Sequence, residues 1–156
     1  MSGAPTDTPG VLILPPWLFL ICAASGTIAH LVCPYRFALA PWARAAAFGL
    51  WLAATAFTLW GVRTMKAAGT NVRPDRPALS IVSHGPFAMT RNPLYLGMIG
   101  LFAGVGIAMG SPAFLTALVP LVVVLHFGVV LREESYLEAK FGDSYRDYKA
   151  RVRRWI

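Results

Sequence analysis

The distribution of charged residues constrains the fold of this chain more than any other feature. Three stretches carry no Asp, Glu, Lys or Arg: 28 residues between Asp7 and Arg36, 18 between Arg44 and Arg63, and 40 between Arg91 and Arg132. About 20 apolar residues span a bilayer as a helix, so these stretches predict about four crossings. The crossings are expected near residues 11–33, 42–62, 93–110 and 112–131.

Composition supports the same fold class. Only 13% of the 156 residues are charged, whereas a soluble domain carries roughly 25% to cover its surface. The sequence therefore predicts an all-α, polytopic membrane protein with a single membrane domain over residues 1–156, and it excludes a soluble enzyme.

The 40-residue stretch is too long for one crossing, and Gly110-Ser111-Pro112 lies at its middle. The Ser111 side chain can cap a helix whose first residue is Pro112. The third and fourth spans are therefore expected to form a tight hairpin. Residues 84–95 and 132–138 would then meet at the same membrane boundary.

Basic residues predict the topology. With four crossings, 12 of the 14 Lys and Arg residues fall on the side that holds the 63–92 loop and both termini, and only Arg36 and Arg44 fall on the other. This asymmetry follows the positive-inside rule, so both termini are expected in the cytosol, at the inner or plasma membrane in a bacterial cell. The net charge of +7 is then explained by topology and by anionic lipid, with no nucleic-acid partner.

Two further segments have a recognisable pattern. Residues 133–156 carry apolar side chains at steps of three and four, which predicts an amphipathic cytosolic helix, with a break at Gly142-Asp143. The third span contains Gly100 and Gly104 in a G-x-x-x-G spacing. That spacing allows either close helix packing or an opening beside the helix for a lipid tail.

The start of the third span is the best candidate for chemistry. Asn92 suits a helix N-cap and Pro93 the first helical position, so free N–H groups and the positive end of the helix dipole point outward there, next to Arg91. This arrangement suits a carboxylate or a phosphate. Glu133 and Glu134 face it across the hairpin. Adjacent helical residues diverge by about 100°, so at most one enters a shared site, and the alternative is that both pair with Arg at the interface.

Several segments in the second half of the chain, in this order, resemble the isoprenylcysteine carboxyl methyltransferase and phospholipid N-methyltransferase group of integral-membrane methyltransferases. The segments are Ala68-Gly69-Thr70-Asn71, Gly85-Pro86-Phe87, Thr90-Arg91-Asn92-Pro93-Leu94-Tyr95-Leu96-Gly97, Arg132-Glu133-Glu134, Phe141-Gly142-Asp143-Ser144-Tyr145 and Tyr148-Lys149-Ala150-Arg151-Val152.

The resemblance implies a pocket for S-adenosylmethionine. The cofactor-binding residues that it implies are Asn92, Pro93, Tyr95, Gly97, Glu133 and Glu134, with His84 as a further candidate beside the Gly-Pro-Phe segment. Many members of the family have His where Asn92 stands. Arg91 and Arg132 are the candidates for holding a carboxylate nucleophile in the reaction. The spacing of His and Cys indicates no metal site.

The expected function is methyl transfer from S-adenosylmethionine to a lipid-soluble or prenylated acceptor in the lipid bilayer, through a carboxylate or an amine. Two alternatives belong to other classes. The first is a nicotinamide-dependent membrane reductase of sterol-like lipids, in which Arg73, Arg76 and Arg91 would hold a 2′-phosphate. The second is a non-catalytic membrane ligand-binding protein.

Overall fold

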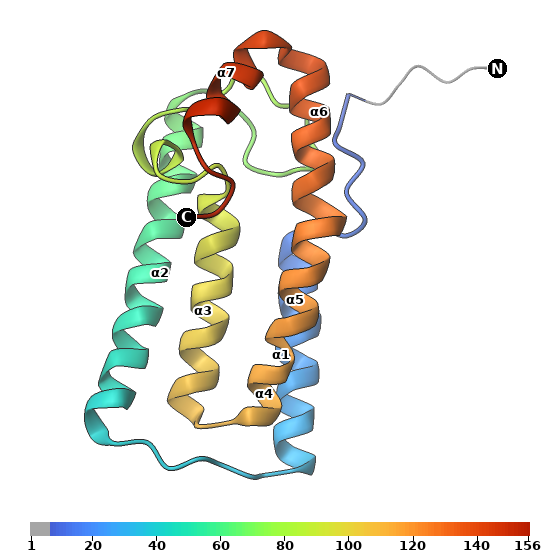
Figure 1. The fold of residues 1–156 in the computed structure, drawn as a ribbon. Helices are drawn as coiled ribbons and strands as arrows, with labels where there is room; N and C mark the ends of the chain where they lie inside the picture. Colours follow the sequence, from blue (N-terminus) through green and yellow to red (C-terminus); the bar gives the residue numbers. More distant parts are fainter. Residues whose placement is uncertain (1–6) are drawn as a thin grey trace, which may run out of the picture.

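The computed structural model describes residues 7–156, and every regular element in that range is helical (Figure 1). The order is α1 (Pro15–Val32), α2 (Pro41–Ala67), a 3-10 turn η1 (Gly85–Ala88) and α3 (Pro93–Met109). A nearly continuous helix from Pro112 to Phe141 follows, formed by α4 (Pro112–Thr116), α5 (Leu118–Val124), a π-helical segment η2 (Leu125–Val130) and α6 (Leu131–Phe141). The last helix is α7 (Asp143–Arg151).

The long helices stand side by side and define two ends of the molecule (Figure 1). We call one the turn end; it holds the connection 33–40 and the turn between α3 and α4. The other is the loop end, which holds residues 68–92, α6, α7 and the last residues of the chain. Residue 7, where the described chain begins, also lies at the loop end.

Three helices are long and apolar enough to cross a membrane: α1, α2 and the helix from Pro112 to Phe141. The shorter apolar helix α3 has 17 residues. This confirms the all-helical membrane fold, while the count of four crossings stays a prediction. At 1.5 Å per residue, the 30-residue helix is about 45 Å long, and a bilayer core is about 30 Å thick. Its apolar part ends at Leu131, so the polar residues of α6 extend beyond it.

Two helix ends differ from those that the sequence predicts: the end of α2 and the end of the C-terminal helix. Helix α2 continues past residue 62 to Ala67, and the chain turns at Gly69, whose φ is 68°. The C-terminal segment breaks at Gly142, as predicted, with φ 55°. Its second half, however, is helical only to Arg151. Residues 152–156 lie outside the helix, and the carbonyls of Arg153 and Arg154 accept hydrogen bonds from residues 90–92, just before α3.

The hairpin turn forms as predicted. Gly110 adopts a left-handed conformation with φ 62°, and the Ser111 hydroxyl accepts a hydrogen bond of 3.1 Å from the Phe114 N–H. The same hydroxyl lies 2.9 Å from Nδ1 of the buried His30 in α1. The turn end therefore joins α1 to the hairpin through a polar contact.

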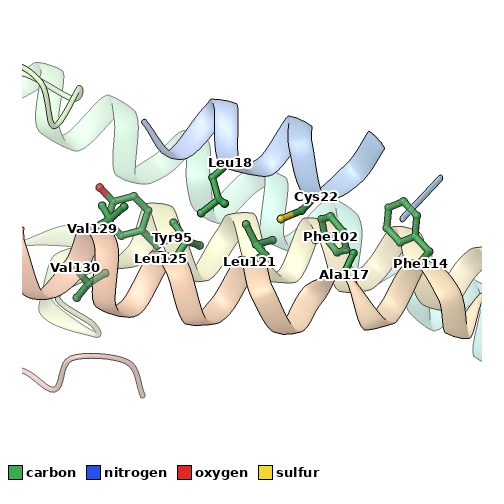
Figure 2. Packing of buried hydrophobic residues seen from close by; sticks show 10 residues of the cluster. All are labelled: Leu18, Cys22, Tyr95, Phe102, Phe114, Ala117, Leu121, Leu125, Val129 and Val130. Atoms are coloured by element: carbon green, nitrogen blue, oxygen red, sulfur yellow. The ribbon is translucent and has the colours of Figure 1, made fainter. Parts of the chain in front are cut away.

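The apolar core lies between α1, α3 and the helix from Pro112 onward (Figure 2). Phe102, Leu121, Leu125 and Val129 are fully enclosed there. Large side chains from three helices thus fill the space that the hairpin and α1 share, and this packing holds the start of α3 near α6.

The small residues of α3 face α2. A Cβ at Gly100 would lie 2.9 Å from the Ala54 Cβ, and a Cβ at Gly104 would lie 3.1 Å from the Ala47 carbonyl oxygen. Close helix packing is therefore the correct interpretation of the G-x-x-x-G spacing. The alternative, a lateral opening at these glycines, is wrong because α2 covers them.

Candidate functional site

A pocket of about 130 Å³ opens among the elements of the loop end. We call it the loop-end pocket. The loop after α2, the start of α3, α6 and α7 all contribute to its walls. Its lining includes Met65, Thr70, Asn71, Arg73, Arg76, Val82, Phe87, Arg91, Asn92, Pro93, Leu94, Tyr95, Glu133, Glu134, Tyr136, Leu137, Tyr145 and Tyr148. The walls therefore combine apolar and aromatic surface with a few charged groups.

Glu133 provides the first of those charged groups. Its Oε1 accepts a hydrogen bond of 2.7 Å from the Tyr95 hydroxyl, which comes from the first turn of α3. Burial raises the pKa of Glu133 from its ordinary value of 4.5 to about 7. The Tyr95 hydrogen bond opposes that rise, while the negative charge of Glu134 adds to it. Glu133 therefore changes charge near neutral pH and accepts a cation more readily than a second anion.

Glu134 is held differently, between two arginines. Arg154 donates from Nε to Oε1 at 2.9 Å and from Nη2 to Oε2 at 2.8 Å, which is a two-point ion pair. Nη1 of Arg91 also lies 3.1 Å from Oε1. Glu134 is only 6% exposed. Both carboxylate oxygens are thus engaged, and Glu134 is a structural anion in the pocket wall.

Arg91 is the least satisfied of these charged groups. Its side chain is 8% exposed, and it lines the loop-end pocket. Within residues 7–156, neither Nε nor Nη1 has a hydrogen-bond acceptor; the contact of Nη1 with Glu134 is an ion pair without hydrogen-bond geometry. Glu134 supplies a negative charge but no hydrogen bond to these two nitrogens, and buried N–H groups without acceptors are costly. Arg91 is therefore suited to bind a carboxylate or a phosphate.

Residues 152–156, which we call the C-terminal strap, cross the start of α3. The Arg91 N–H donates to the Arg153 carbonyl at 3.0 Å. The Arg154 carbonyl accepts from the Thr90 hydroxyl at 3.0 Å and from the Asn92 side-chain amide at 2.9 Å. Asn92 is therefore occupied in holding the strap, and its side chain caps no helix N–H.

Residues 7–14, the N-terminal strap, run alongside the helix that contains α6 (Figure 1). Asp7 pairs with Lys140 at 2.6 Å and accepts from the Tyr136 hydroxyl at 2.8 Å. Further along, the Leu12 N–H donates to the carbonyl of Gly128 at 3.0 Å, within the π-helical segment. Tyr136 also accepts from the N–H of Ala78, so one side chain joins the N-terminal strap to the loop.

Two aromatic residues of α7, Tyr145 and Tyr148, form part of the pocket wall next to the start of α3. Tyr148 donates to the Phe87 carbonyl at 2.8 Å, and burial raises the pKa of Tyr145 to about 12. Tyr145 is only 2% exposed. Both hydroxyls therefore stay neutral at physiological pH and serve as walls and hydrogen-bonding groups.

The structure brings six of the nine predicted site residues to the pocket: Arg91, Asn92, Pro93, Tyr95, Glu133 and Glu134. The other three lie elsewhere. Arg132 is exposed and donates to the Gly10 carbonyl at 3.0 Å. His84 is exposed at the start of η1. Gly97 packs against Ala54 and Thr58 of α2, where a Cβ would lie 3.1 Å from the Ala54 carbonyl oxygen.

Several further residues of the site are not among the nine candidates. Arg154 stands in a run of basic residues that the positive-inside rule already explains, and nothing in its spacing indicates a site. Tyr145 and Tyr148 belong to segments that carry the family resemblance and to the apolar positions of the C-terminal helix, and both line the pocket. Arg73 and Arg76, which the sequence offers as partners of a 2′-phosphate in the reductase alternative, also line the pocket, and Arg73 is paired with Asp75 at 2.6 Å.

Within residues 7–156, no group of three or more His, Cys, Asp or Glu side chains is arranged to hold a metal ion. The pocket instead offers one guanidinium that needs an anion and one carboxylate that titrates near neutral pH. These groups lie among aromatic and aliphatic side chains at the polar end of membrane-spanning helices. Such a pocket suits a ligand with both an anionic and a cationic group and a flat or apolar remainder.

Comparison with known proteins identifies the family of the chain. The family model described as phospholipid methyltransferase matches residues 42–144, about two thirds of the chain, from the start of α2 to the start of α7. An uncharacterised protein of Haemophilus influenzae is 35% identical over 63 residues, which are 40% of this chain and the full length of that protein. The chain belongs to the phospholipid methyltransferase family, which is one of the families of integral-membrane methyltransferases.

Proposed function

We propose that this protein is an S-adenosylmethionine-dependent methyltransferase whose acceptor is a lipid with a headgroup amine. The observation that carries the proposal is the presence, in one pocket, of a buried Arg91 whose Nε and Nη1 have no hydrogen-bond acceptor and of a Glu133 that ionises near neutral pH. The pocket lies at the loop end, next to the membrane-spanning part of the helices.

The residues fit the chemical groups of S-adenosylmethionine. Its amino-acid part has a carboxylate, which the Arg91 guanidinium can accept, and an ammonium group, which an ionised Glu133 can accept. Its sulfonium adds a second positive charge, which also favours an ionised Glu133. The aromatic and aliphatic walls from Phe87, Tyr145 and Tyr148 suit the adenosine part.

When bound, the cofactor supplies a methyl group on a positively charged sulfur. A headgroup amine would first give up its proton to water and would then form the N–C bond with its lone pair, while the S–C electron pair would return to sulfur. The residues of the protein align the reactants and exclude water, and alignment can lower a barrier by roughly 7–11 kcal/mol.

The placement of Arg132 favours an amine acceptor over a carboxylate acceptor. A carboxylate nucleophile taken out of water needs a cation to hold it. Arg91 is assigned to the cofactor, and Arg132, the other candidate, is exposed and bound to the Gly10 carbonyl. An uncharged amine needs no such partner.

The test uses purified protein in lipid nanodiscs and S-adenosylmethionine with a tritiated methyl group. Phosphatidylethanolamine and a farnesylated cysteine derivative are supplied as alternative acceptors, and binding of S-adenosylhomocysteine is measured by calorimetry. We expect micromolar binding and transfer to the amine lipid. Binding with transfer only to the farnesylated carboxylate would overturn the acceptor assignment. Absence of binding to the wild-type protein would overturn the cofactor assignment.

A further inference from the structure

We propose that Arg154 is a positioning residue that keeps Arg91 available for an oxyanion in the loop-end pocket. This inference deepens the proposed function and rests on it for the identity of the ligand. Arg154 donates the hydrogen bonds that the buried Glu134 needs. Glu134 therefore does not take the hydrogen bonds of the Arg91 guanidinium, which stay available for a ligand.

The first step concerns the number of charges. Two guanidinium groups, from Arg91 and Arg154, face a single carboxylate, Glu134. A carboxylate accepts one guanidinium in a parallel two-point pair, which is the strongest geometry available to it. Arg154 has that geometry, through Nε at 2.9 Å and Nη2 at 2.8 Å. The positive charge of Arg91 is therefore the surplus in this group of three.

The second step concerns the geometry that remains for Arg91. Its Nη1 lies 3.1 Å from Oε1 of Glu134 but makes no hydrogen bond, and its Nε has no acceptor in the described chain. If Arg154 were absent, the buried Glu134 would lose both of its hydrogen bonds. A buried carboxylate left unpaired is strongly destabilising. Since Arg91 is already adjacent, Glu134 would take it as the replacement partner.

The third step is that the backbone fixes Arg154 in place. Its carbonyl accepts from Thr90 and Asn92, the residues on either side of Arg91. The next residue, Trp155, packs with its ring 6.1 Å from that of His126 on the last membrane-spanning helix. Arg154 therefore reaches Glu134 from a fixed point. The same three residues, 90–92, hold Arg154 and present Arg91.

The oxyanion that Arg91 receives is a carboxylate or a phosphate. In this pocket a carboxylate would come from the amino-acid part of the cofactor, and a phosphate would come from a lipid headgroup. The experiment has a separate arm for each source, and a third arm with inorganic phosphate that needs neither the cofactor nor a lipid.

The variants are Arg154→Ala, Arg154→Lys, Glu134→Gln and the double variant Arg154→Ala with Glu134→Gln. Arg146→Ala is the matched control, because Arg146 is an exposed arginine of the same tail that pairs with Asp143. Each variant is titrated with S-adenosylhomocysteine and with 5′-methylthioadenosine, which lacks the amino-acid part. Thermal stability is measured with and without inorganic phosphate, and the KM for the lipid acceptor is measured separately from kcat.

We expect Arg154→Ala to weaken S-adenosylhomocysteine binding by about ten- to hundredfold, which corresponds to one charged hydrogen bond. Binding of 5′-methylthioadenosine should change by less than about threefold. Removing the Glu134 charge in the same chain should restore S-adenosylhomocysteine binding, because Arg91 is then free again. Arg154→Lys should be intermediate, since Lys cannot make the two-point pair. Phosphate should stabilise the wild type and the double variant but not Arg154→Ala.

A lipid phosphate as the partner of Arg91 would give a different pattern: the KM for the lipid would rise in Arg154→Ala while cofactor binding stayed unchanged. The proposal is overturned if Arg154→Ala weakens both nucleoside ligands equally and Glu134→Gln fails to restore them, because the strap would then be only structural. It is also overturned if no ligand, phosphate or lipid measurement responds to the variant. If phosphate behaves as expected and the wild type binds no S-adenosylhomocysteine, the proposed function fails and this inference stands.

Discussion

Tyr95 and Glu133, 38 positions apart in the chain, meet at the loop end through a hydrogen bond of 2.7 Å. This contact decides which of the two adjacent carboxylates serves the pocket. Because neighbouring helical residues point about 100° apart, Glu133 faces the first turn of α3 while Glu134 faces Arg154. Under the proposed function Glu133 binds a cationic group of the ligand, while Arg91 and Arg154 neutralise Glu134.

The first prediction is that ligand binding depends on pH through Glu133. Its pKa of about 7 means that the empty pocket is largely protonated at pH 6 and ionised at pH 8. A cationic ligand group needs the ionised form. The affinity for S-adenosylhomocysteine, measured by calorimetry, should therefore increase about tenfold from pH 6 to pH 8.

Two variants control that measurement. Glu133→Gln should bind more weakly and show no rise with pH. Tyr95→Phe removes the hydrogen bond that favours the charged form, so the midpoint of the rise should move to higher pH. An unchanged midpoint in Tyr95→Phe would contradict the assignment of the titration to Glu133.

The second prediction concerns stability. The pKa of Glu133 is about 7 in the folded protein and 4.5 ordinarily, so the folded state binds more protons between these values. The free energy of unfolding should therefore fall as pH rises from about 4.5 to 7, by at most about 3 kcal/mol. Glu133→Gln has no carboxyl group to ionise, so its stability does not fall in this way. The Tm of the variant minus that of the wild type should therefore be larger at pH 8 than at pH 5. A Tm difference that does not change with pH would refute the raised pKa.

The third prediction separates the two arginines that the sequence offered for catalysis. Arg91→Ala should weaken S-adenosylhomocysteine binding by about ten- to hundredfold, since a buried charged contact in the pocket is lost. Arg132→Ala removes an equal charge from an exposed position that donates to the Gly10 carbonyl. It should leave binding within about threefold of wild type. A large loss in Arg132→Ala would return that residue to the site.

The parts of this molecule that the sequence predicts are those that a bilayer imposes. Backbone groups in lipid must be satisfied within a helix, so an uncharged stretch of sufficient length has few other structures open to it. The turn at Gly110-Ser111-Pro112 follows because Gly, a capping Ser and Pro each favour one position there. With the hairpin fixed, the meeting of the α3 start with Glu133 and Glu134 also follows.

The parts that the sequence does not predict depend on long-range contacts without a periodic signal. The C-terminal strap is extended, and the backbone carbonyls of Arg153 and Arg154 accept hydrogen bonds from residues about 60 positions away. Because these acceptors are backbone atoms, the side chains of the strap give no sign of them in the sequence. The rotation of α6 about its axis decides that Arg132 turns away from the pocket, and three consecutive polar residues do not fix that rotation. Gly97 suits a ligand or a helix neighbour equally well by sequence.

The fourth prediction tests that role of Gly97. A Cβ there would press on Thr58 and lie 3.1 Å from the Ala54 carbonyl oxygen. Gly97→Ala should therefore lower the free energy of unfolding by about 1–3 kcal/mol through overpacking. Gly49→Ala is the matched control, because nothing lies within 4 Å of a Cβ at Gly49; it should be neutral or stabilising by up to about 1 kcal/mol.

Thermal unfolding in detergent measures both glycine variants, and S-adenosylhomocysteine binding is scored per folded molecule. A Gly97→Ala protein as stable as wild type but unable to bind would show that Gly97 belongs to the cofactor site rather than to the α2 contact.

The last prediction is the topology, and it uses a native cysteine. The straps at the two ends of the described chain lie at the loop end, which carries 12 of the 14 basic residues, while Arg36 and Arg44 lie at the turn end. The loop end should therefore be cytosolic.

The labelling experiment uses the two native cysteines: Cys33 is exposed at the turn end, and Cys22 is buried. In intact cells, an impermeant maleimide should label Cys33 and fail to label the variant Cys33→Ser. A cysteine placed at the exposed Ser83 of the loop, in the Cys33→Ser background, should be labelled only after permeabilisation. Labelling of Ser83→Cys in intact cells would reverse the orientation, and the pocket would then open away from the cytosolic supply of its ligand.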